Sequence, residues 1–156
     1  MIIRRMTKAD VKAVFDIELH TFAVPWPEAS FQHEMDANPA ARYLVAEGDG
    51  GEILGYAGAW MIFEEAHITN IAVKKSCRGQ GIGRKLAEAL IQYAANLGVQ
   101  YMTLEVRRSN LIAQDMYRKL DFEKFSTRKR YYPDNDEDAF LMVLQHMPEV
   151  EEDFTE

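Results

Sequence analysis

Residues 67–98, HITNIAVKKSCRGQGIGRKLAEALIQYAANLG, decide the fold of this chain. The first seven are rich in β-branched side chains, which favour a strand. Apolar residues then recur at steps of three and four, as on one face of a helix: Ile82, Leu86, Leu90, Tyr93 and Leu97. Gly98 follows the last of them, where a left-handed helix cap is expected. The stretch therefore predicts a strand, a glycine-rich turn and a helix with one buried face.

A basic, glycine-rich turn joins the expected strand to the expected helix. It runs from Lys74 to Gly83 and contains the motif Arg78, Gly79, Gln80, Gly81, Ile82 and Gly83. Lys74, Lys75, Arg78 and the following Arg84 give it positive charge. Glycine has no Cβ, so the backbone N–H groups of such a turn can approach a ligand closely. A helix N-terminus adds unpaired N–H donors and the positive end of the helix dipole. A phosphate or pyrophosphate is therefore the expected ligand, and a glycine-rich connection that binds nothing is the alternative.

The spacing of the glycines narrows the choice of ligand. The turn has no Gly-Lys-Ser/Thr of a Walker A loop, and its glycines at 79, 81 and 83 do not fit the dinucleotide fingerprint. Arg-x-x-Gly-x-Gly after a strand instead resembles the acetyl-CoA motif of the GCN5-related N-acetyltransferases (GNAT). This resemblance implies acetyl-CoA as co-substrate. It also implies a mixed α/β GNAT fold, in which a mostly antiparallel sheet with helices on both faces splays apart at the acetyl-CoA site.

Composition and charge bound the remaining possibilities. The 156 residues, 47% hydrophobic and 28% charged, predict one globular domain over residues 1–147 and an acidic tail, residues 148–156, expected to be disordered. The net charge of −7 argues against nonspecific nucleic-acid binding and favours a basic peptide or a cationic amine as partner. The single cysteine, Cys77, allows no internal disulfide. No signal peptide or membrane-spanning run is recognised, so we expect a cytoplasmic monomer or weak dimer with no membrane partner.

The N-terminal part predicts a strand followed by two helices. Residues 2–5 suit a short strand, and Thr7 is a good N-cap for the first helix. Two prolines on either side of Trp26 then interrupt the chain before a second helix over residues 28–37. Trp26 is expected either to pack against the core or to line the acceptor site, and its residue type alone does not decide between them.

Strands dominate the rest of the chain. They are expected over residues 43–47, 52–63, 101–106, 122–132 and 138–145, with one further helix that begins at Ser109 or Asn110 and runs to about Leu120. Alternation along the strand over residues 101–106 predicts a buried face and an opposite, polar face. The buried face carries Met102, Leu104 and Val106, and the opposite face carries Thr103, Glu105 and Arg107.

A second signature begins in the strand over residues 101–106. It reads LEVRxSNxxAxxxYxxLxF from Leu104 to Phe122, and a Tyr-Tyr-Pro element follows it. These motifs are similar to those of the RimI-type bacterial protein N-terminal acetyltransferases, which acetylate the N-terminal alanine of small-subunit ribosomal protein eighteen. The resemblance covers nearly the whole chain and is weakest before residue 40 and after residue 147. One departure is Asp121, which stands where the family has a glycine in left-handed geometry.

The resemblance assigns roles to individual residues. Glu105 matches the family's general base, and Tyr117 matches the general acid that returns a proton to the leaving thiolate. A peptide α-amine has a pKa near 8, about two units below lysine, so its proton is the easier one to remove. Besides the glycine-rich turn, the coenzyme is expected to contact the side chain of Asn110 and the main chain of Ile71, Ala72 and Val73. The acceptor site is expected to include Trp26, Tyr131 and Tyr132.

Other interpretations stay open at this point. Glu105 could be a surface carboxylate paired with Arg107, and Tyr117 could be a core aromatic. His67 is expected to face a neighbouring strand rather than to act as a base. The acceptor could be a small-molecule amine or a lysine side chain, and the chain could be a non-catalytic module that binds acetyl-CoA and regulates a partner. No metal is expected, since the four histidines show no ligand spacing with the cysteine.

Overall fold

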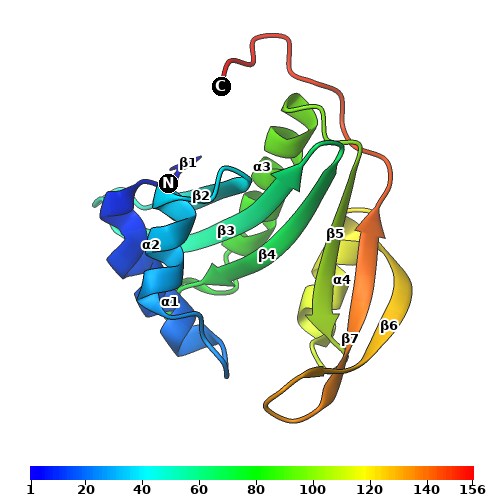
Figure 1. Cartoon of the computed structure of the whole chain (residues 1–156). Helices are drawn as coiled ribbons and strands as arrows, with labels where there is room; N and C mark the ends of the chain where they lie inside the picture. The colour runs from blue at the N-terminus through cyan, green and yellow to red at the C-terminus, as the bar shows by residue number, and fades with distance from the viewer. The chain divides into compact units, whose positions relative to one another are not determined.

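Helices and strands occur in the order expected from the sequence. The computed structural model describes residues 1–156. Its elements, labelled in Figure 1, are β1 (Ile2–Arg5), η1 (Lys8–Asp10), α1 (Val11–Thr21), α2 (Glu28–Asp36), β2 (Ala41–Glu47), β3 (Ile53–Ile62), β4 (Glu65–Val73), η2 (Lys75–Cys77), α3 (Ile82–Asn96), β5 (Tyr101–Arg107), α4 (Leu111–Lys119), β6 (Glu123–Tyr132) and β7 (Glu137–Leu144). None of the helices is both long and apolar enough to cross a membrane.

The strands form a seven-stranded, mostly antiparallel sheet. Its hydrogen-bonded order is β1-β2-β3-β4-β5-β7-β6. The β1–β2, β2–β3, β5–β7 and β6–β7 pairs are antiparallel. The β4–β5 pair is parallel, from Glu65 opposite Tyr101 to His67 opposite Thr103. The mixed α/β fold implied by the GNAT resemblance is confirmed, whereas the splaying of the sheet at an acetyl-CoA site stays a prediction.

The chain divides into two compact units, which are described separately. The first unit comprises Met1–Trp60 and Thr69–Leu90, and the second comprises Met61–Ile68 and Ile91–Glu156. In the first unit α1 and α2 lie side by side (Figure 1), and their apolar faces pack on the strands. The core consists of Met6, Val11, Val14, Ile17, Phe31, Tyr43, Val45, Tyr56 and Ala72. Phe31 makes edge contacts with the rings of Tyr43 and Tyr56, which gives this core an aromatic centre.

The start of the first helical segment confirms the expected N-cap. Thr7 has an extended backbone, and its amide donates to Asp10 Oδ2 at 2.8 Å, which closes the turn η1 that leads into α1. Arg4 of β1 donates to both oxygens of the same carboxylate, at 2.8 and 2.9 Å. This bidentate pair fixes the entry of the helix relative to the first strand.

The second unit is built around β5. Met102, Leu104 and Val106 are buried and the alternate residues are partly exposed, as the period of two predicts. Helix α4 lies against the β5–β7–β6 strands (Figure 1), and its Tyr117 ring makes an edge contact with Phe122 at 5.6 Å. Asp121 between them has a φ of +72°, which is the left-handed geometry expected at this helix end. Gly98 after α3 likewise has a φ of +89°.

The acidic tail contacts the second half of α3 within the second unit. The Phe154 ring meets the Tyr93 ring edge-on at 6.2 Å, and the Tyr93 hydroxyl donates to Glu156 at 3.1 Å. The Glu151 amide donates to Asn96 Oδ1 at 3.0 Å. These contacts are few and exposed, so the disorder expected for residues 148–156 stays a prediction that limited proteolysis can test.

Candidate functional site

The glycine-rich turn of the first unit presents unpaired backbone donors. Gly79 and Gly81 have φ values of +80° and +79°, and a Cβ built on either one meets no atom within 4 Å. Helix α3 begins at the buried Ile82, and the Lys85 amide makes its first backbone bond, to Gly81 O at 3.1 Å. The amides of residues 81–84 are therefore the unpaired first-turn donors of α3. Open space and free amides suit an anion at this turn.

The arginines of the turn form contacts within the protein. Arg78 donates from Nε to Val73 O at 3.1 Å and from Nη2 to Thr21 Oγ1 at 3.3 Å. Arg84 pairs with Glu88 one helical turn on, at 2.8 Å. Arg78 thus ties the turn to β4 and α1, a tertiary role that the motif alone could not reveal. A cavity of about 510 Å³ lies beside this contact, lined by Asp16, Ile17, His20, Thr21, Lys74, Lys75 and Ser76.

The remaining candidates of the first unit lie on β4 and before α2. Ala72 is buried, whereas Ile71 and Val73 are half-buried at the end of β4. Trp26 is half-buried, and its ring lies 5.6 Å from Phe31 and 6.3 Å from Trp60. Trp26 therefore packs on the core and keeps an exposed edge, so a place in the acceptor site stays a prediction.

Two buried carboxylates of the first unit were not foreseen. Glu18 of α1 accepts hydrogen bonds from the Tyr56 hydroxyl, from Asn70 Nδ2 at 3.2 Å and from the Trp26 amide at 2.9 Å. Burial raises the pKa of Tyr56, and the charge of Glu18 adds to this, so the phenol keeps the proton that it donates.

Glu34 of α2 has a similar set of donors. It accepts hydrogen bonds from the Tyr43 hydroxyl at 3.1 Å, Trp60 Nε1 at 2.6 Å and Asn38 Nδ2 at 2.6 Å. From the sequence alone, a glutamate on either helix suggests a solvent-exposed face. The structure shows instead that Glu18 and Glu34 are buried and that their buried oxygens have hydrogen-bond partners.

Glu105, on β5 of the second unit, is held at both carboxylate oxygens. His67 Nε2 lies 2.8 Å from Oε2, and Arg128 Nε lies 3.1 Å from Oε1. The side chain is 11% exposed. Burial raises the pKa of Glu105, but the hydrogen bond and charge of His67 and the charge of Arg128 outweigh it and leave the pKa lowered. Glu105 is therefore an ionised carboxylate with a small accessible surface.

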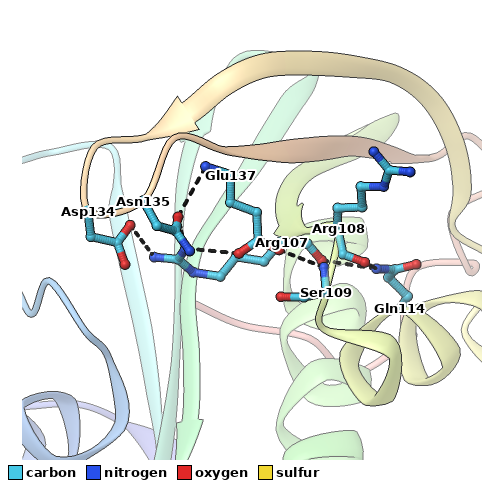
Figure 2. Close-up of polar contacts among 7 residues, drawn as sticks. All are labelled: Arg107, Arg108, Ser109, Gln114, Asp134, Asn135 and Glu137. Atoms are coloured by element: carbon cyan, nitrogen blue, oxygen red, sulfur yellow. Dashed lines mark hydrogen bonds and ion pairs between the residues drawn. The ribbon is translucent and has the colours of Figure 1, made fainter.

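The pairing of Glu105 with Arg107, one of the alternatives, is wrong. Arg107 points instead to the β6–β7 turn and the start of β7. It donates to Asp134 at 3.0 Å and Asn135 at 3.3 Å in the turn, and to Glu137 of β7 at 3.1 Å (Figure 2). Its guanidinium also lies over the Tyr132 ring, 3.9 Å from the centroid.

The carboxylate of Glu137 and the side chain of Gln114 extend this set of contacts. The other Glu137 oxygen accepts from the Ser109 amide at 2.7 Å, and Gln114 of α4 donates to the Arg107 and Arg108 carbonyls (Figure 2). The end of β5, the start of α4 and the β6–β7 turn are thereby tied together. We call Arg107, Asp134, Asn135 and Glu137 the turn latch.

Helix α4 carries Asn110 and Tyr117 one above the other. Asn110 caps the helix, since its Oδ1 accepts from the Ala113 amide at 3.1 Å, and its Nδ2 makes no hydrogen bond within the protein. Tyr117 is buried, and burial raises the pKa of its phenol. Tyr117 is therefore both a core aromatic and a group that keeps its proton at neutral pH.

Tyr131 and Tyr132 pack against each other at the end of β6. Their rings meet edge-on at 5.0 Å. Tyr131 is 45% exposed, while burial raises the pKa of Tyr132 to about 12. Tyr132 is thus within electrostatic reach of both Glu105 and Tyr117, because the charge of Glu105 raises the pKa of Tyr132 and Tyr132 raises the pKa of Tyr117.

The contact of His67 with Glu105 was not predicted from the sequence. His67 does face a neighbouring strand, as expected, but it also binds Glu105, which the parallel register of β4 and β5 brings within reach. Strand register would have been the signal, and it cannot be deduced from periodicity alone.

No group of three or more histidine, cysteine, aspartate or glutamate side chains is arranged to hold a metal ion.

Comparisons with known proteins agree with this geometry. A model of the acetyltransferase (GNAT) family matches residues 11–122. The chain belongs to this family and is an N-acetyltransferase.

Individual relatives are similar along their whole length. An Escherichia coli protein named [ribosomal protein bS18]-alanine N-acetyltransferase is 36% identical, over 91% of this chain and 95% of its own. A Bacillus subtilis protein, provisionally described by the same activity, is 41% identical over 90% and 92%. The crystal structure of the Escherichia coli ribosomal-protein-S18-alanine N-acetyltransferase superposes with a TM-score of 0.84, at 31% identity over 99% of both chains.

Proposed function

We propose that this enzyme transfers the acetyl group of acetyl-CoA to the N-terminal amine of a protein, with the N-terminal alanine of small-subunit ribosomal protein bS18 as acceptor. The observation that carries this proposal is the similarity over nine tenths of both chains to a relative named for that activity. Because the family model and the relatives run through both compact units, we treat residues 1–147 as one acetyltransferase domain.

The reaction makes three demands on the protein. The amine nitrogen forms a bond to the thioester carbon, and the carbon–sulfur bond breaks. The amine gives up a proton, and the departing thiolate takes one. An α-amine has a pKa of about 8, against about 10.4 for lysine, so a carboxylate can assist its deprotonation at neutral pH. No metal is needed for any of these steps.

Glu105 suits the role of proton acceptor in direct attack of the amine. Its carboxylate is ionised because His67 and Arg128 lower its pKa. His67 contacts one carboxylate oxygen and Arg128 forms an ion pair with the other, and a lone pair that remains can take the amine proton, directly or through one water. An α-amine is a better match than a lysine for a carboxylate whose basicity is low.

Tyr117 suits the role of proton donor to the leaving thiolate. Burial keeps its phenol neutral, so the proton is present when it is needed. The ring is fixed by its edge contact with Phe122, which orients the hydroxyl without holding the oxygen. A phenol held in this orientation loses little conformational entropy when it donates its proton to the thiolate.

The residues expected at the coenzyme fit an acetyl-CoA. The amides at the start of α3 and the open space over Gly79 and Gly81 suit its pyrophosphate. The free Nδ2 of Asn110 can donate to a carbonyl of the pantetheine arm, and the main chain of residues 71–73 can pair with that arm as an added strand. The acceptor peptide is assigned to Trp26, Tyr131 and Tyr132, whose rings are partly exposed.

Peptides test the proposal. A peptide with the N-terminal sequence of bS18 and a free alanine amine should be acetylated by this enzyme and acetyl-CoA. The matched peptide with a blocked N-terminus and a lysine should not react. Acetylation of the blocked peptide alone would overturn the N-terminal assignment in favour of a lysine acceptor.

A further inference from the structure

Polar side chains of β4 and β5 form a connected row on one face of the second unit. The strands are parallel, with Glu65 opposite Tyr101 and His67 opposite Thr103. Because side chains alternate along a strand, Glu105 follows Thr103 on the same face. His67 contacts both, since Nδ1 lies 2.7 Å from Thr103 Oγ1 and Nε2 lies 2.8 Å from Glu105 Oε2.

Hydrogen-bond chemistry assigns the protons in this row. An ionised carboxylate can only accept, so His67 Nε2 carries the hydrogen that it donates to Glu105. In a neutral imidazole the other nitrogen is then an acceptor, and the Thr103 hydroxyl is the donor in reach. The same hydroxyl lies 3.5 Å from Glu65, a much longer contact, so its single hydrogen is directed to the imidazole. His67 Nε2 can donate to Glu105 whether the imidazole is neutral or charged, and in the neutral form Thr103 selects the tautomer that presents this donor.

We propose that His67 and Thr103 are positioning residues for acetyl transfer, which hold Glu105 as an ionised and oriented carboxylate. The proposal rests on the proposed role of Glu105 as general base. His67 contacts one oxygen and Arg128 the other, which restricts the orientation of the carboxylate. A carboxylate that is already oriented loses less conformational entropy when it accepts the amine proton.

The titratable groups around Glu105 set the sign of the expected effect. His67 on β4 and Arg128 on β6 lower the pKa of Glu105 against the opposing effect of burial, which is the largest single cause. Tyr131 and Tyr132 on β6 also face the carboxylate, and its charge adds to the effect of burial in raising both of their pKa values. Without His67, burial is less opposed, so the pKa of Glu105 rises and the base becomes protonated at a higher pH.

Two pairs of substitutions test the proposal in steady-state assays with an alanine-initiated peptide. His67→Ala is expected to lower kcat about tenfold, a modest share of the 10²–10⁴ that a general base contributes. It should also move the acid limb of the pH profile to higher pH and leave the KM for acetyl-CoA unchanged. His67→Gln keeps a neutral donor and should recover part of kcat. Thr103→Val should lower kcat in the same direction, and Thr103→Ser should restore it.

A titration of the Glu105 carboxyl by NMR in the free protein gives a readout independent of turnover. A higher pKa in His67→Ala supports the proposal. An unchanged pKa with wild-type kcat overturns it, and so does a loss of kcat in Thr103→Val that Thr103→Ser fails to reverse. If His67→Ala does not fold, His67→Gln and the Thr103 pair carry the same test.

Glu105→Gln, measured beside these variants, separates the two proposals. If it turns over like the wild type, Glu105 is not the base and the positioning role falls with it, while the NMR titration still reports the His67 contact. If Glu105→Gln is impaired and His67→Ala is not, the base assignment stands and only the positioning role is lost.

Discussion

Glu105 and Tyr117 owe their proposed roles to their surroundings rather than to residue type. A glutamate on a half-exposed strand is ordinarily a solvated charge, but here two donors hold it and lower its pKa. A tyrosine on an amphipathic helix is ordinarily core, and here burial also keeps its phenol protonated. The same environment that makes each residue structural therefore gives it a defined protonation state.

Single substitutions at these two residues should separate catalysis from binding. Glu105→Gln and Tyr117→Phe each remove a proton-transfer group and keep the shape, so we expect kcat to fall about 100-fold in each. Calorimetry should find wild-type affinity for acetyl-CoA in both. Wild-type turnover in both variants would mean that neither group moves a proton in the reaction.

The buried Glu18 makes a prediction about stability. Tyr56→Phe removes one donor from a carboxylate that is 2% exposed, so the free energy of unfolding should fall by about 1–3 kcal/mol. Urea denaturation measures this change. Tyr101→Phe is the matched control, because its hydroxyl makes only an exposed 3.5 Å contact, and it should change stability by less than about 0.5 kcal/mol. Equal effects of the two changes would mean that the hydrogen bond from Tyr56 to Glu18 does not stabilise the fold.

At the scale of elements, the turn latch joins β5 to the β6–β7 turn. Arg107 uses its planar fork to reach three side chains (Figure 2). The face of its guanidinium covers the Tyr132 ring. Lysine offers one point of charge, so it cannot reproduce these contacts. The latch is therefore expected to order the two tyrosines assigned to the acceptor site.

Arg107→Lys should weaken acceptor binding without affecting the coenzyme. We expect the KM for the peptide to rise about tenfold, which corresponds to about 1.4 kcal/mol, and the KM for acetyl-CoA to stay the same. Arg108→Lys is the control, since that side chain lies outside the latch (Figure 2). If both variants bind the peptide as the wild type does, the latch plays no part in acceptor binding.

The latch also predicts a pH dependence of stability. Hydrogen bonds from Ser109 make the largest contribution to a lowered pKa of Glu137. The hydrogen bond and the charge of Arg107 also lower it, and the pKa falls from 4.5 to about 2. Because the folded pKa is the lower one, the stabilisation is complete above 4.5 and is lost as the pH falls toward about 2. The difference in unfolding free energy between wild type and Glu137→Gln should shrink over this range. A difference that is constant with pH would contradict the lowered pKa.

At the scale of the whole molecule, periodicity and capping predicted the elements well. The apolar stripe of α3, the alternation of β5 and the Thr7 cap are local signals that appear in the structure. Ile82, Leu86 and Leu90 of the stripe are buried, whereas Tyr93 is half-buried and Leu97 lies just beyond the end of α3. The two signatures also led to the family, which the comparisons confirm. Each of these inferences depends on residues close together in the sequence.

Contacts between distant elements could not be predicted in this way. His67 reaches Glu105 through strand register, and Arg78 reaches Thr21 across 57 positions. Glu18 is enclosed by Tyr56 and Asn70 only once α1 has packed on the sheet. Such pairings have no period and no fixed spacing, so a single sequence carries no local sign of them.

Intact-protein mass spectrometry can show whether this enzyme acetylates a protein N-terminus. Purified, unacetylated bS18 is incubated with this enzyme and acetyl-CoA, and the modified residue is located by fragmentation. We expect one added acetyl group, on the N-terminal alanine, and an about 100-fold slower addition when the enzyme carries Glu105→Gln. An unmodified bS18, or an acetyl group found only on lysine side chains, would contradict the proposed N-terminal acetylation.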